Sequence, residues 1–142
     1  MALMTAVVTL QEDLKFRVEA GSGHALTVDG PLDAYGGNAG FRPMELMLMS
    51  LGGCMALDVL LVLRRMRQEV TAYQVRLTGE RAEEPPAVYT AVTLEHVIAG
   101  PRLGKQSVER ALKLAEDKYC SAWAMISRTA RLTNRYRIEG AQ

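Results

Sequence analysis

Cysteine is scarce in this chain of 142 residues, which contains only Cys54 and Cys120. Two thiols so far apart exclude a CxxC redox motif and a zinc ribbon, and one pair cannot form the disulfide framework of a small secreted protein. Free cysteines are among the most buried residue types. The two thiols are therefore either inert core residues or a pair that meets in the folded protein, and their spacing leaves both interpretations open.

Net charge and aromatic residues are also low. The formal net charge is +1, aromatic residues make up 6% of the chain, and no arginine-rich stripe with interleaved aromatic residues occurs. A protein that binds nucleic acid ordinarily carries a clustered positive charge. We therefore expect no nucleic-acid partner.

The sequence lacks an uncharged run long enough for a membrane span. Glu45 and Asp58 interrupt the apolar stretch from Pro43 to Leu63, whereas a spanning helix needs about 20 consecutive apolar residues. The opening MALMTAVVTL has no basic segment before it and no small-residue cleavage site, so it predicts a first strand and not a signal peptide. We expect no membrane partner and a cytoplasmic location.

What the chain does contain fits a single domain over residues 1–142, with 49% hydrophobic and 23% charged residues. Leu14, Phe16 and Val18 alternate with charged residues, which predicts a strand, and residues 24–28 are its expected hairpin partner. Residues 29–42 hold four glycines and a proline, which indicates a long loop that carries or covers a site.

The middle and the last third predict helices as well as strands. Pro43 suits a first helical residue and a cluster of arginines suits a last turn, so a helix is expected over 43–66. The second predicted helix has an apolar face at helical spacing, formed by Val108, Ala111, Leu112 and Ala115. Ser107 is the expected N-cap of the second helix, which is expected to end near Lys118. Strands over 70–78 and 88–99 are expected to form a hairpin. A short helix over 121–130 and a last strand over 132–138 complete the expected elements. The fold class is therefore α+β.

Gly52 and Gly53 precede Cys54 in the middle of the first predicted helix. Each glycine costs a helix interior about 1 kcal/mol relative to alanine, so a compensating role is expected. Residues without side chains let a second backbone approach, or they leave space beside the Cys54 sulfur. Both hold if the approaching helix belongs to a second copy of the chain.

Asp58 lies one helical turn after Cys54, where a carboxylate raises a thiol pKa and does not activate it. We expect Asp58 to pair with an arginine or to cap a neighbouring element. Cys120 lies between two helical segments, and the free N–H groups at the start of the second are expected to stabilise a thiolate there.

Two segments around the cysteines carry a family resemblance. PMELMLMSLGGCMALDVLLVLRRM, followed by ALKLAEDKYCSAWAMI, resembles the OsmC/Ohr family: small residues precede a cysteine in a central helix, and a second cysteine opens a short helix after a tyrosine. The loop HALTVDGPLDAYGGNAG is similar to the OsmC-like subgroup. The resemblance spans most of the chain.

The resemblance implies an intertwined homodimer whose long central helices pack against antiparallel sheets. It also implies a thiol peroxidase for small organic hydroperoxides, in which Cys54 becomes a sulfenic acid and then forms a disulfide with Cys120. A dithiol, typically a lipoyl group, would reduce that disulfide. The resemblance implies neither a metal nor a flavin as cofactor.

The family's glutamate and arginine correspond to Glu45 and Arg17, each displaced by one position. Nine residues of helix place Glu45 on the opposite side from Cys54 and about 13 Å away, so it reaches Cys54 only from a partner chain or through an irregular first turn. A one-residue shift on a strand turns Arg17 to the other face, where the alternative is a solvent-facing partner of Lys15 and Glu19. His24 is expected at the surface or at a strand end.

Methionines crowd the first predicted helix, and Trp123 follows Cys120 by three residues. Met47, Met55 and Trp123 are the candidates for an apolar substrate pocket that would favour alkyl hydroperoxides, although core packing also explains the methionines. The alternative function is a redox-responsive or small-ligand-binding protein of the same fold without catalytic turnover. A third hypothesis makes both cysteines core residues of a structural dimer.

Overall fold

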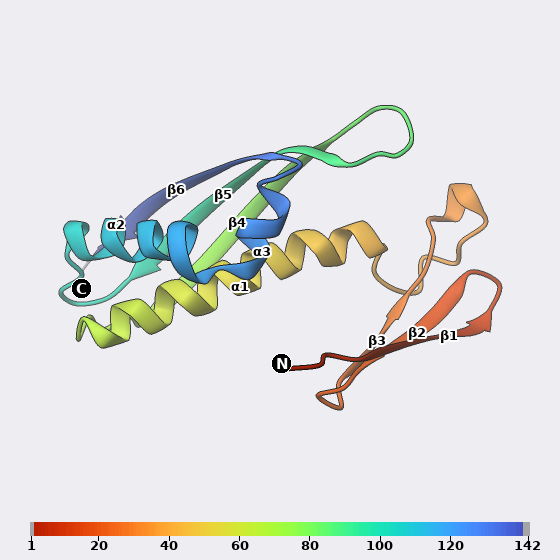
Figure 1. The fold of residues 1–142 in the computed structure, drawn as a ribbon, viewed down its shortest axis with the longest axis horizontal. Helices are drawn as coiled ribbons and strands as arrows, with labels where there is room; N and C mark the ends of the chain where they lie inside the picture. The colour runs from red at the N-terminus through yellow and green to blue at the C-terminus, as the bar shows by residue number, and fades with distance from the viewer. Residues whose placement is uncertain (1, 141–142) are drawn as a thin grey trace. The chain divides into compact units, whose positions relative to one another are not determined.

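The computed structural model describes residues 2–140 of the chain. It divides into two compact units, Met1–Met47 and Leu48–Gln142. Each unit contains one three-stranded sheet, and the helices lie between the sheets in the sequence or follow the second hairpin (Figure 1). The α+β class expected from the sequence is confirmed.

The first unit is a meander of three antiparallel strands, β1 (Ala6–Glu12), β2 (Lys15–Ala20) and β3 (Ala25–Val28). The alternating pattern predicted β2, and the expected hairpin partner is β3, in a register that pairs Phe16 with Val28. The opening segment also forms a strand, as predicted, because β1 pairs with β2 along its whole length.

A buried carboxylate organises the glycine-rich loop after β3. Asp29 is 5% exposed and accepts hydrogen bonds from the backbone N–H groups of Gly30, Gly37 and Ala39 at 2.7–3.1 Å. These donors, led by the Ala39 N–H, hold the pKa of Asp29 below its usual value. The loop N–H groups are therefore used within the loop itself.

The second unit is a helix-covered sheet with the strand order β4 (Ala72–Arg81), β5 (Tyr89–Ala99) and β6 (Arg131–Glu139). The long helix α1 (Pro43–Arg65) and the helix α2 (Lys105–Leu114) lie on one face of this sheet (Figure 1). A π-helical turn η2 (Ala115–Tyr119) and the short helix α3 (Ser121–Ile126) follow α2.

The core lies between the helices and the inner face of β5. Leu51, Met55 and Val59 of α1 are fully buried at 0% exposure, as is every apolar residue predicted for α2 except Leu112, which is 6% exposed. From β5 the core receives Val92, Leu94, His96 and Ile98. The alternation of these four residues is the period of a strand that is covered on one face.

One helix of the described chain, α1, is long and apolar enough to cross a membrane, with a mean hydropathy of 2.2 over its best 18-residue window. A third of that window (33%) is buried inside the protein. A core helix passes the same test of length and composition, because a helix buried on several sides is apolar all round. Length and hydropathy alone are therefore weak evidence for a membrane segment.

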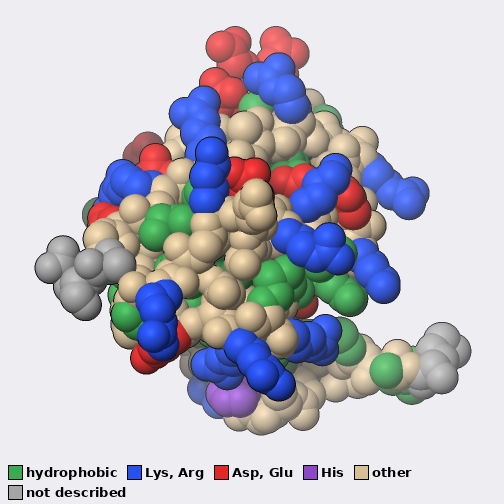
Figure 2. Space-filling view, turned by 90° about the vertical axis from the view of Figure 1, so that its left-hand side faces the viewer, with side chains coloured by type: hydrophobic (Ala, Val, Ile, Leu, Met, Phe, Trp, Pro, Cys, Tyr) green, Lys and Arg blue, Asp and Glu red, His purple; other side chains and the backbone are tan. Residues whose placement is uncertain are grey.

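The outer face of the second sheet carries paired charges. Glu95 lies 3.8 Å from Arg76 and 4.0 Å from Arg137, and Arg137 also pairs with Glu139 at 3.1 Å. Figure 2, which views the molecule from the left-hand end of Figure 1, also shows basic and acidic side chains interspersed. Exposed pairs of this kind contribute little to stability, typically less than about 1 kcal/mol each.

Four details differ from the sequence-based expectations. The short helix α3 ends at Ile126 and not at residue 130. The helix α2 begins at Lys105 and not after Ser107, and its N-cap is Gly104, which offers no capping side chain and whose own N–H donates to Gln68 Oε1 at 2.9 Å. Regular α-helix ends at Leu114, before the expected end, because the chain continues as the π-helical turn η2. The second sheet is mixed, since β5 and β6 run parallel and the helical segment between them forms the crossover.

Candidate functional site

The rotation of α1 decides where Cys54 points. Leu51, Met55 and Val59 face the core, so Cys54 and Asp58 occupy the neighbouring strip of the helix and are half-buried. Residues four apart lie on the same face of a helix, one turn from each other. The Cys54 thiol and the Asp58 carboxylate are consequently neighbours, with Sγ and Oδ2 3.9 Å apart.

The two glycines before Cys54 have different surroundings. A Cβ atom on Gly52 would lie 2.5 Å from Leu77 Cδ1, so this glycine lets α1 approach strand β4 closely. Around Gly53, by contrast, nothing lies within 4 Å of the position that a Cβ would take, and the residue is exposed. Close packing was the right explanation for Gly52, although the approaching element is a strand of the same unit and not a helix.

Cys120 is held between η2 and α3. Its backbone N–H donates to the Ala115 carbonyl at 2.8 Å, which closes the π-helical turn, and its sulfur accepts the Trp123 N–H at 3.3 Å as the N-cap of α3. Turns of this π type are rare in proteins, and those that occur often lie at functional sites. The side chain is only 2% exposed.

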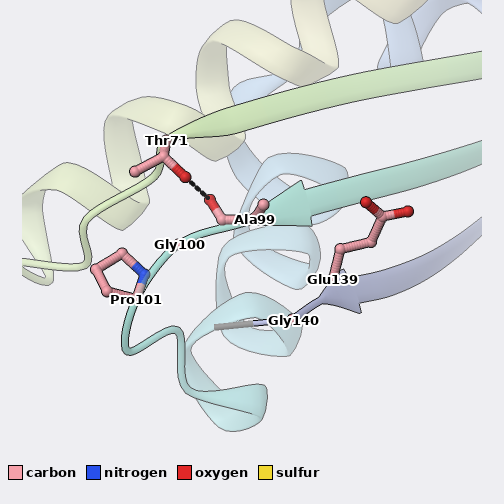
Figure 3. Close-up of a pocket in the computed structure, with 6 residues that line it drawn as sticks. All are labelled: Thr71, Ala99, Gly100, Pro101, Glu139 and Gly140. Atoms are coloured by element: carbon pink, nitrogen blue, oxygen red, sulfur yellow. Dashed lines mark hydrogen bonds between the residues drawn. The ribbon is translucent and has the colours of Figure 1, made fainter. Parts of the chain in front are cut away.

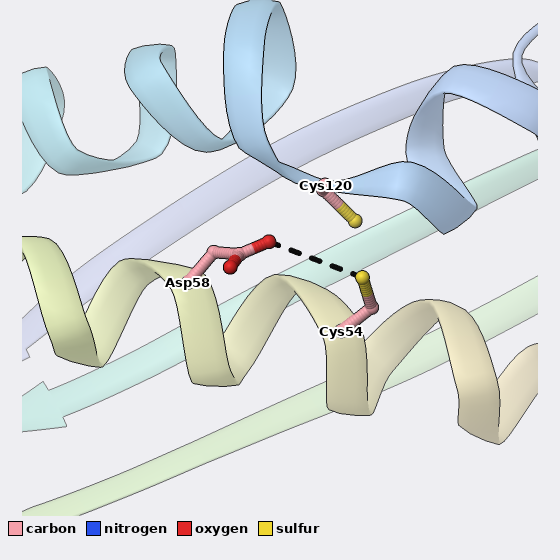
Figure 4. Close-up of side chains that lie close together, drawn as sticks. All are labelled: Cys54, Asp58 and Cys120. Carbon is pink, nitrogen blue, oxygen red and sulfur yellow. Dashed lines mark hydrogen bonds between the residues drawn. The ribbon is translucent and has the colours of Figure 1, made fainter. Parts of the chain in front are cut away.

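These elements bring the two sulfurs together. Cys54 Sγ, Cys120 Sγ and an oxygen of Asp58 all lie within 4.8 Å of one another, and both cysteines are free thiols (Figure 4). The side chains come from the middle of α1 and from the turn before α3 and point toward one another (Figure 4). The spacing left two interpretations open, separate core cysteines and a pair of thiols that meet, and the structure agrees with the second.

Burial dominates the electrostatics of Cys120. It raises the pKa of the Cys120 thiol to about 12, and the adjacent Cys54 and Asp58 act in the same direction. The Trp123 N–H lowers the pKa, as expected for a thiol at a helix N-terminus, but its effect is smaller than that of burial. The expectation of a stabilised thiolate at Cys120 was therefore wrong, because one N–H donor does not compensate for the loss of water.

Asp58 also differs from expectation. Among residues 2–140 no ion pair reaches Asp58, and its hydrogen bond is the one that Cys54 Sγ donates. The expected arginine partner is absent because Arg64 and Arg65 follow Asp58 by six and seven residues, beyond the three or four that place side chains side by side on a helix. Asp58 faces the two thiols instead.

Glu45 and Arg17 have local partners. Glu45 accepts the Arg42 N–H at 2.8 Å, which is the carboxylate half of a capping box at the start of α1. Arg17 pairs with Glu19 at 3.1 Å and is half exposed. Lys15 pairs with Glu12 at 2.8 Å and takes no part in the Arg17 contact.

The expected pocket residues differ in burial. Met55 is fully buried in the core, Met47 is 46% exposed, and Trp123 is half-buried beside Cys120. His24 is exposed before β3, with its Nδ1 3.0 Å from Ser22 Oγ, as expected for a surface histidine.

A cavity of about 450 Å³ lies elsewhere, at the end of the second sheet (Figure 3). It contains neither cysteine, and its one charged side chain is Glu139. Its lining residues are Thr71, Ala99, Gly100, Pro101, Glu139 and Gly140. A cavity with so few convergent polar groups offers no set of groups for catalysis.

A polar network next to η2 was missed in the sequence. Buried His96 lies 2.6 Å from Tyr73 Oη through Nδ1 and 2.7 Å from Asn134 Oδ1 through Nε2, and Asn134 donates its amide to Glu116 at 2.7 Å. Because the Asn134 oxygen faces His96, Nε2 donates and Nδ1 accepts the tyrosine proton, which assigns one neutral tautomer. The sequence does contain a signal for the burial of His96, because this residue occupies the same alternating positions of the strand as the apolar residues Val92, Leu94 and Ile98.

This network predicts a pH-dependent stability. Burial lowers the pKa of His96 below 6.5, so the unfolded chain binds a proton before the folded chain does. The free energy of unfolding should be constant above the unfolded pKa and fall as the pH drops below about 6.5, by about 1.4 kcal/mol for each unit of pKa difference. Urea unfolding at pH 7.5 and 5.5, at fixed protein concentration, measures this loss.

The chain has only two histidines, which provides a matched control. The His24→Gln variant should keep the loss of stability between pH 7.5 and 5.5, because His24 is exposed. The His96→Gln variant should lose it. Equal losses in the two variants would assign the effect to other groups.

Comparison with known proteins identifies the family. The model of the OsmC-like protein family matches residues 36–134. Protein YhfA of Escherichia coli K12 is 38% identical over 138 residues, which are 97% of this chain and 100% of that protein. The chain belongs to the OsmC-like protein family. The resemblance of the two cysteine segments predicted this membership, which is now confirmed.

Solved structures share the OsmC-like fold over nearly the whole chain. A hypothetical protein from Aquifex aeolicus VF5 has a TM-score of 0.86 and 29% identity, with 98% of each chain covered. An organic hydroperoxide resistance protein OsmC from Legionella pneumophila has a TM-score of 0.73 and 15% identity, with 96% of this chain and 97% of that chain covered. At 15% identity the likeness concerns the fold alone. Proteins named for hydroperoxide resistance are thus among the structural neighbours.

Proposed function

We propose that this protein is a thiol-dependent peroxidase that reduces organic hydroperoxides through Cys54 and Cys120. The observation that carries the proposal is the approach of the two sulfurs to within 4.8 Å, from residues distant in the sequence. Unpaired core cysteines have no reason to converge in this way. Hydroperoxide consumption by the wild-type protein and by the Cys54→Ser variant tests the proposal, since only the former should consume peroxide faster than buffer.

The environments of the thiols favour Cys54 as the nucleophile. Cys54 is half-buried, whereas Cys120 is 2% exposed and has a pKa raised to about 12 by burial. The Cys54 thiolate attacks the terminal peroxide oxygen, the O–O bond breaks, and the alkoxide takes up a proton and leaves as an alcohol. Cys54 is then a sulfenic acid, oxidised by two electrons.

Cys120 completes the cycle. Its sulfur attacks the Cys54 sulfur, the S–O bond breaks, and the hydroxyl leaves as water with the proton of the Cys120 thiol. A dithiol reductant, such as a lipoyl group on a protein, restores both thiols by exchange through a mixed disulfide. This sequence requires neither a metal nor a flavin. Free thiols are typical of a reducing compartment, and we propose the cytoplasm as the site of action.

Met47, Met55 and Trp123 are proposed to provide an apolar surface for the alkyl group. Trp123 is the best supported of the three, because its backbone N–H binds the Cys120 sulfur and its side chain is half-buried. Methionine side chains adapt to ligands of different shapes, which suits a range of alkyl groups.

Glu45 and Arg17 are proposed to assist catalysis, and Glu45 can be tested against its capping role. Glutamine also suits this position of a capping box, so Glu45→Gln should keep the stability of the protein. If the carboxylate acts in proton transfer, the same variant should lose turnover by about 100-fold or more. Glu45→Ala should in addition cost about 1 kcal/mol of stability through loss of the cap.

Steady-state peroxide consumption and urea unfolding of both variants provide the measurements. Full turnover in Glu45→Gln would limit Glu45 to helix capping. Unchanged stability in Glu45→Ala would mean that the contact with the Arg42 N–H contributes nothing.

A homodimer is the proposed assembly, formed by residues 1–142 as one domain. In the single chain β1 is exposed throughout, with Val7 and Val8 at 57% and 61%, and strands need an apolar face packed against other elements to be stable. On α1, Leu57 and Leu61 are 65% and 47% exposed beside the open space at Gly53. Exposed apolar side chains that gather on one face are typical of surfaces that a second subunit covers.

The second candidate function is a redox-responsive or ligand-binding protein without turnover. Its support is the absence, among residues 2–140, of any Lys or Arg hydrogen bond to either sulfur, since a nearby cation is the usual activator of a thiolate. Formation of a Cys54 sulfenic acid that no dithiol can recycle would favour this function over the peroxidase.

A further inference from the structure

The candidate site contains three groups that can each carry a negative charge, and within residues 2–140 no Lys or Arg forms a hydrogen bond or an ion pair with any of them. Cys54 Sγ, Cys120 Sγ and the Asp58 carboxylate converge within 4.8 Å. None of the ion pairs found among residues 2–140 involves Asp58, although its carboxylate is half-buried. Partly buried carboxylates are ordinarily paired with a cation or bind a metal.

We propose that the reduced protein binds one Zn²⁺ ion per chain through Cys54 Sγ, Cys120 Sγ and Asp58 Oδ2. Two thiolates and one carboxylate form a donor set that binds Zn²⁺ in preference to Mg²⁺ or Ca²⁺, because the latter two ions need several hard oxygen ligands. Three protein ligands leave the fourth tetrahedral position for water.

The observed distances suit such a site. With Zn–S bonds of about 2.3 Å and a Zn–O bond of about 2.0 Å, tetrahedral geometry separates the two sulfurs by about 3.8 Å and a sulfur from the oxygen by about 3.5 Å. Cys54 Sγ and Asp58 Oδ2 are 3.9 Å apart, and the widest separation in the cluster is within 4.8 Å. Closing the site therefore requires each pair of ligand atoms to approach by about 1.3 Å or less.

The elements that hold the ligands are well suited to a metal. Cys54 and Asp58 are four residues apart on α1, the spacing at which two side chains of one helix bind zinc in the H-E-x-x-H motif. Cys120 is positioned by the N–H of Trp123, which donates to its sulfur and would act as an outer-shell contact of the ligand. Cys54 and Asp58 are half-buried, so an ion has a route from solvent.

Zinc binding and oxidation compete for the same two sulfurs. Binding replaces the two thiol protons, which are released to solvent, by one Zn²⁺ ion. If an organic hydroperoxide takes two electrons from the two sulfurs, a disulfide forms, the peroxide becomes an alcohol and water after uptake of two protons, and the ion leaves because no thiolate remains. The zinc site itself requires only the three side chains and does not depend on peroxidase turnover.

The test is a zinc titration of the reduced, untagged protein, with a chromogenic chelator as competitor and no free thiol in the buffer. We expect one Zn²⁺ per chain and about two protons released per ion, measured from the buffer dependence of the binding enthalpy. Co²⁺ in place of Zn²⁺ should give sulfur-to-metal charge-transfer absorption. Asp58→Asn should weaken zinc binding by about tenfold or more, and Cys54→Ser and Cys120→Ser by more than Asp58→Asn.

Asp117→Asn is the matched control, because Asp117 lies three residues before Cys120 but pairs with Lys113 at 3.1 Å. It should bind zinc like the wild type, and circular dichroism verifies that all variants are folded. Wild-type protein without stoichiometric zinc, or zinc affinity unchanged in Asp58→Asn and in Cys54→Ser, would overturn the site.

The metal site and the peroxidase can fail separately. Peroxide consumption is measured on the same protein samples in the presence of the chelator. Zinc binding without peroxide consumption would support the metal site and remove the peroxidase. Peroxide consumption without zinc binding would overturn the metal site and leave the peroxidase standing.

Discussion

Replacing Cys54 with serine is expected to reduce hydroperoxide consumption to the uncatalysed rate. A serine hydroxyl is not ionised near neutral pH, and its oxygen lacks the nucleophilicity of a thiolate sulfur toward a peroxide. A sulfenic acid cannot form at this position without the sulfur. Consumption of cumene hydroperoxide, followed with a dithiol as reductant, measures the effect. Wild-type activity in Cys54→Ser would dispose of the proposed mechanism.

Cys120→Ser is expected to behave differently, which makes the pair of variants informative. Cys54 should still react once with peroxide, because Cys120 enters only in the second step. The sulfenic acid should then accumulate, and mass spectrometry after trapping with dimedone should find it on Cys54. If Cys120→Ser instead loses the first turnover as well, Cys120 and not Cys54 is the nucleophile.

Replacing Leu57 with glutamate is expected to convert the proposed dimer into monomers. Leu57 is the most exposed apolar side chain on the α1 face that also carries Gly53 and Leu61. In a dimer joined through this face, each glutamate would be buried without a cation, at a cost of about 3 kcal/mol or more. That cost weakens association by about 100-fold or more. Light scattering on a size-exclusion column at micromolar concentration measures the mass.

Val88→Glu is the matched control for this experiment. Val88 is 38% exposed and lies at the end of the turn between β4 and β5, outside α1. The same charge at this position should leave the dimer intact. A wild-type protein that is monomeric, or a Leu57→Glu variant that stays dimeric, would show that this face of α1 is not the subunit interface.

The sequence was sufficient to predict where helices and strands occur. Pro43 and the arginines bound α1 to within one residue, and the apolar spacing of α2 named the residues that are buried there. These features depend on neighbours within a few positions, which the sequence lists directly. The predicted N-cap of α2 was wrong, since the helix begins before Ser107, at Lys105, after Gly104, whose N–H donates to Gln68 from a distant segment.

The candidate site was predictable only in part. Cys54, Cys120 and the role of Gly52 as a position of close packing followed from the sequence and from the family resemblance. The orientation of Asp58 toward the thiols could not be predicted, because the side chain of a helical aspartate can adopt several orientations. The arginines that were expected to pair with it lie too far along the helix. Neutral His96 contacts Tyr73 and Asn134 and so links three strands. These residues are distant in the sequence, so no local pattern predicts their contact.

By itself the sequence determined the family and the α+β class and singled out the two cysteines, because hydrophobic periodicity and the cysteine-containing segments are local properties of the chain. Tertiary structure alone decided that the two sulfurs and the Asp58 carboxylate share one site, and that burial raises the pKa of the Cys120 thiol. The physical reason is that proximity across the fold and burial from water are set by how α1 and the turn before α3 pack on the sheet, which no stretch of sequence contains.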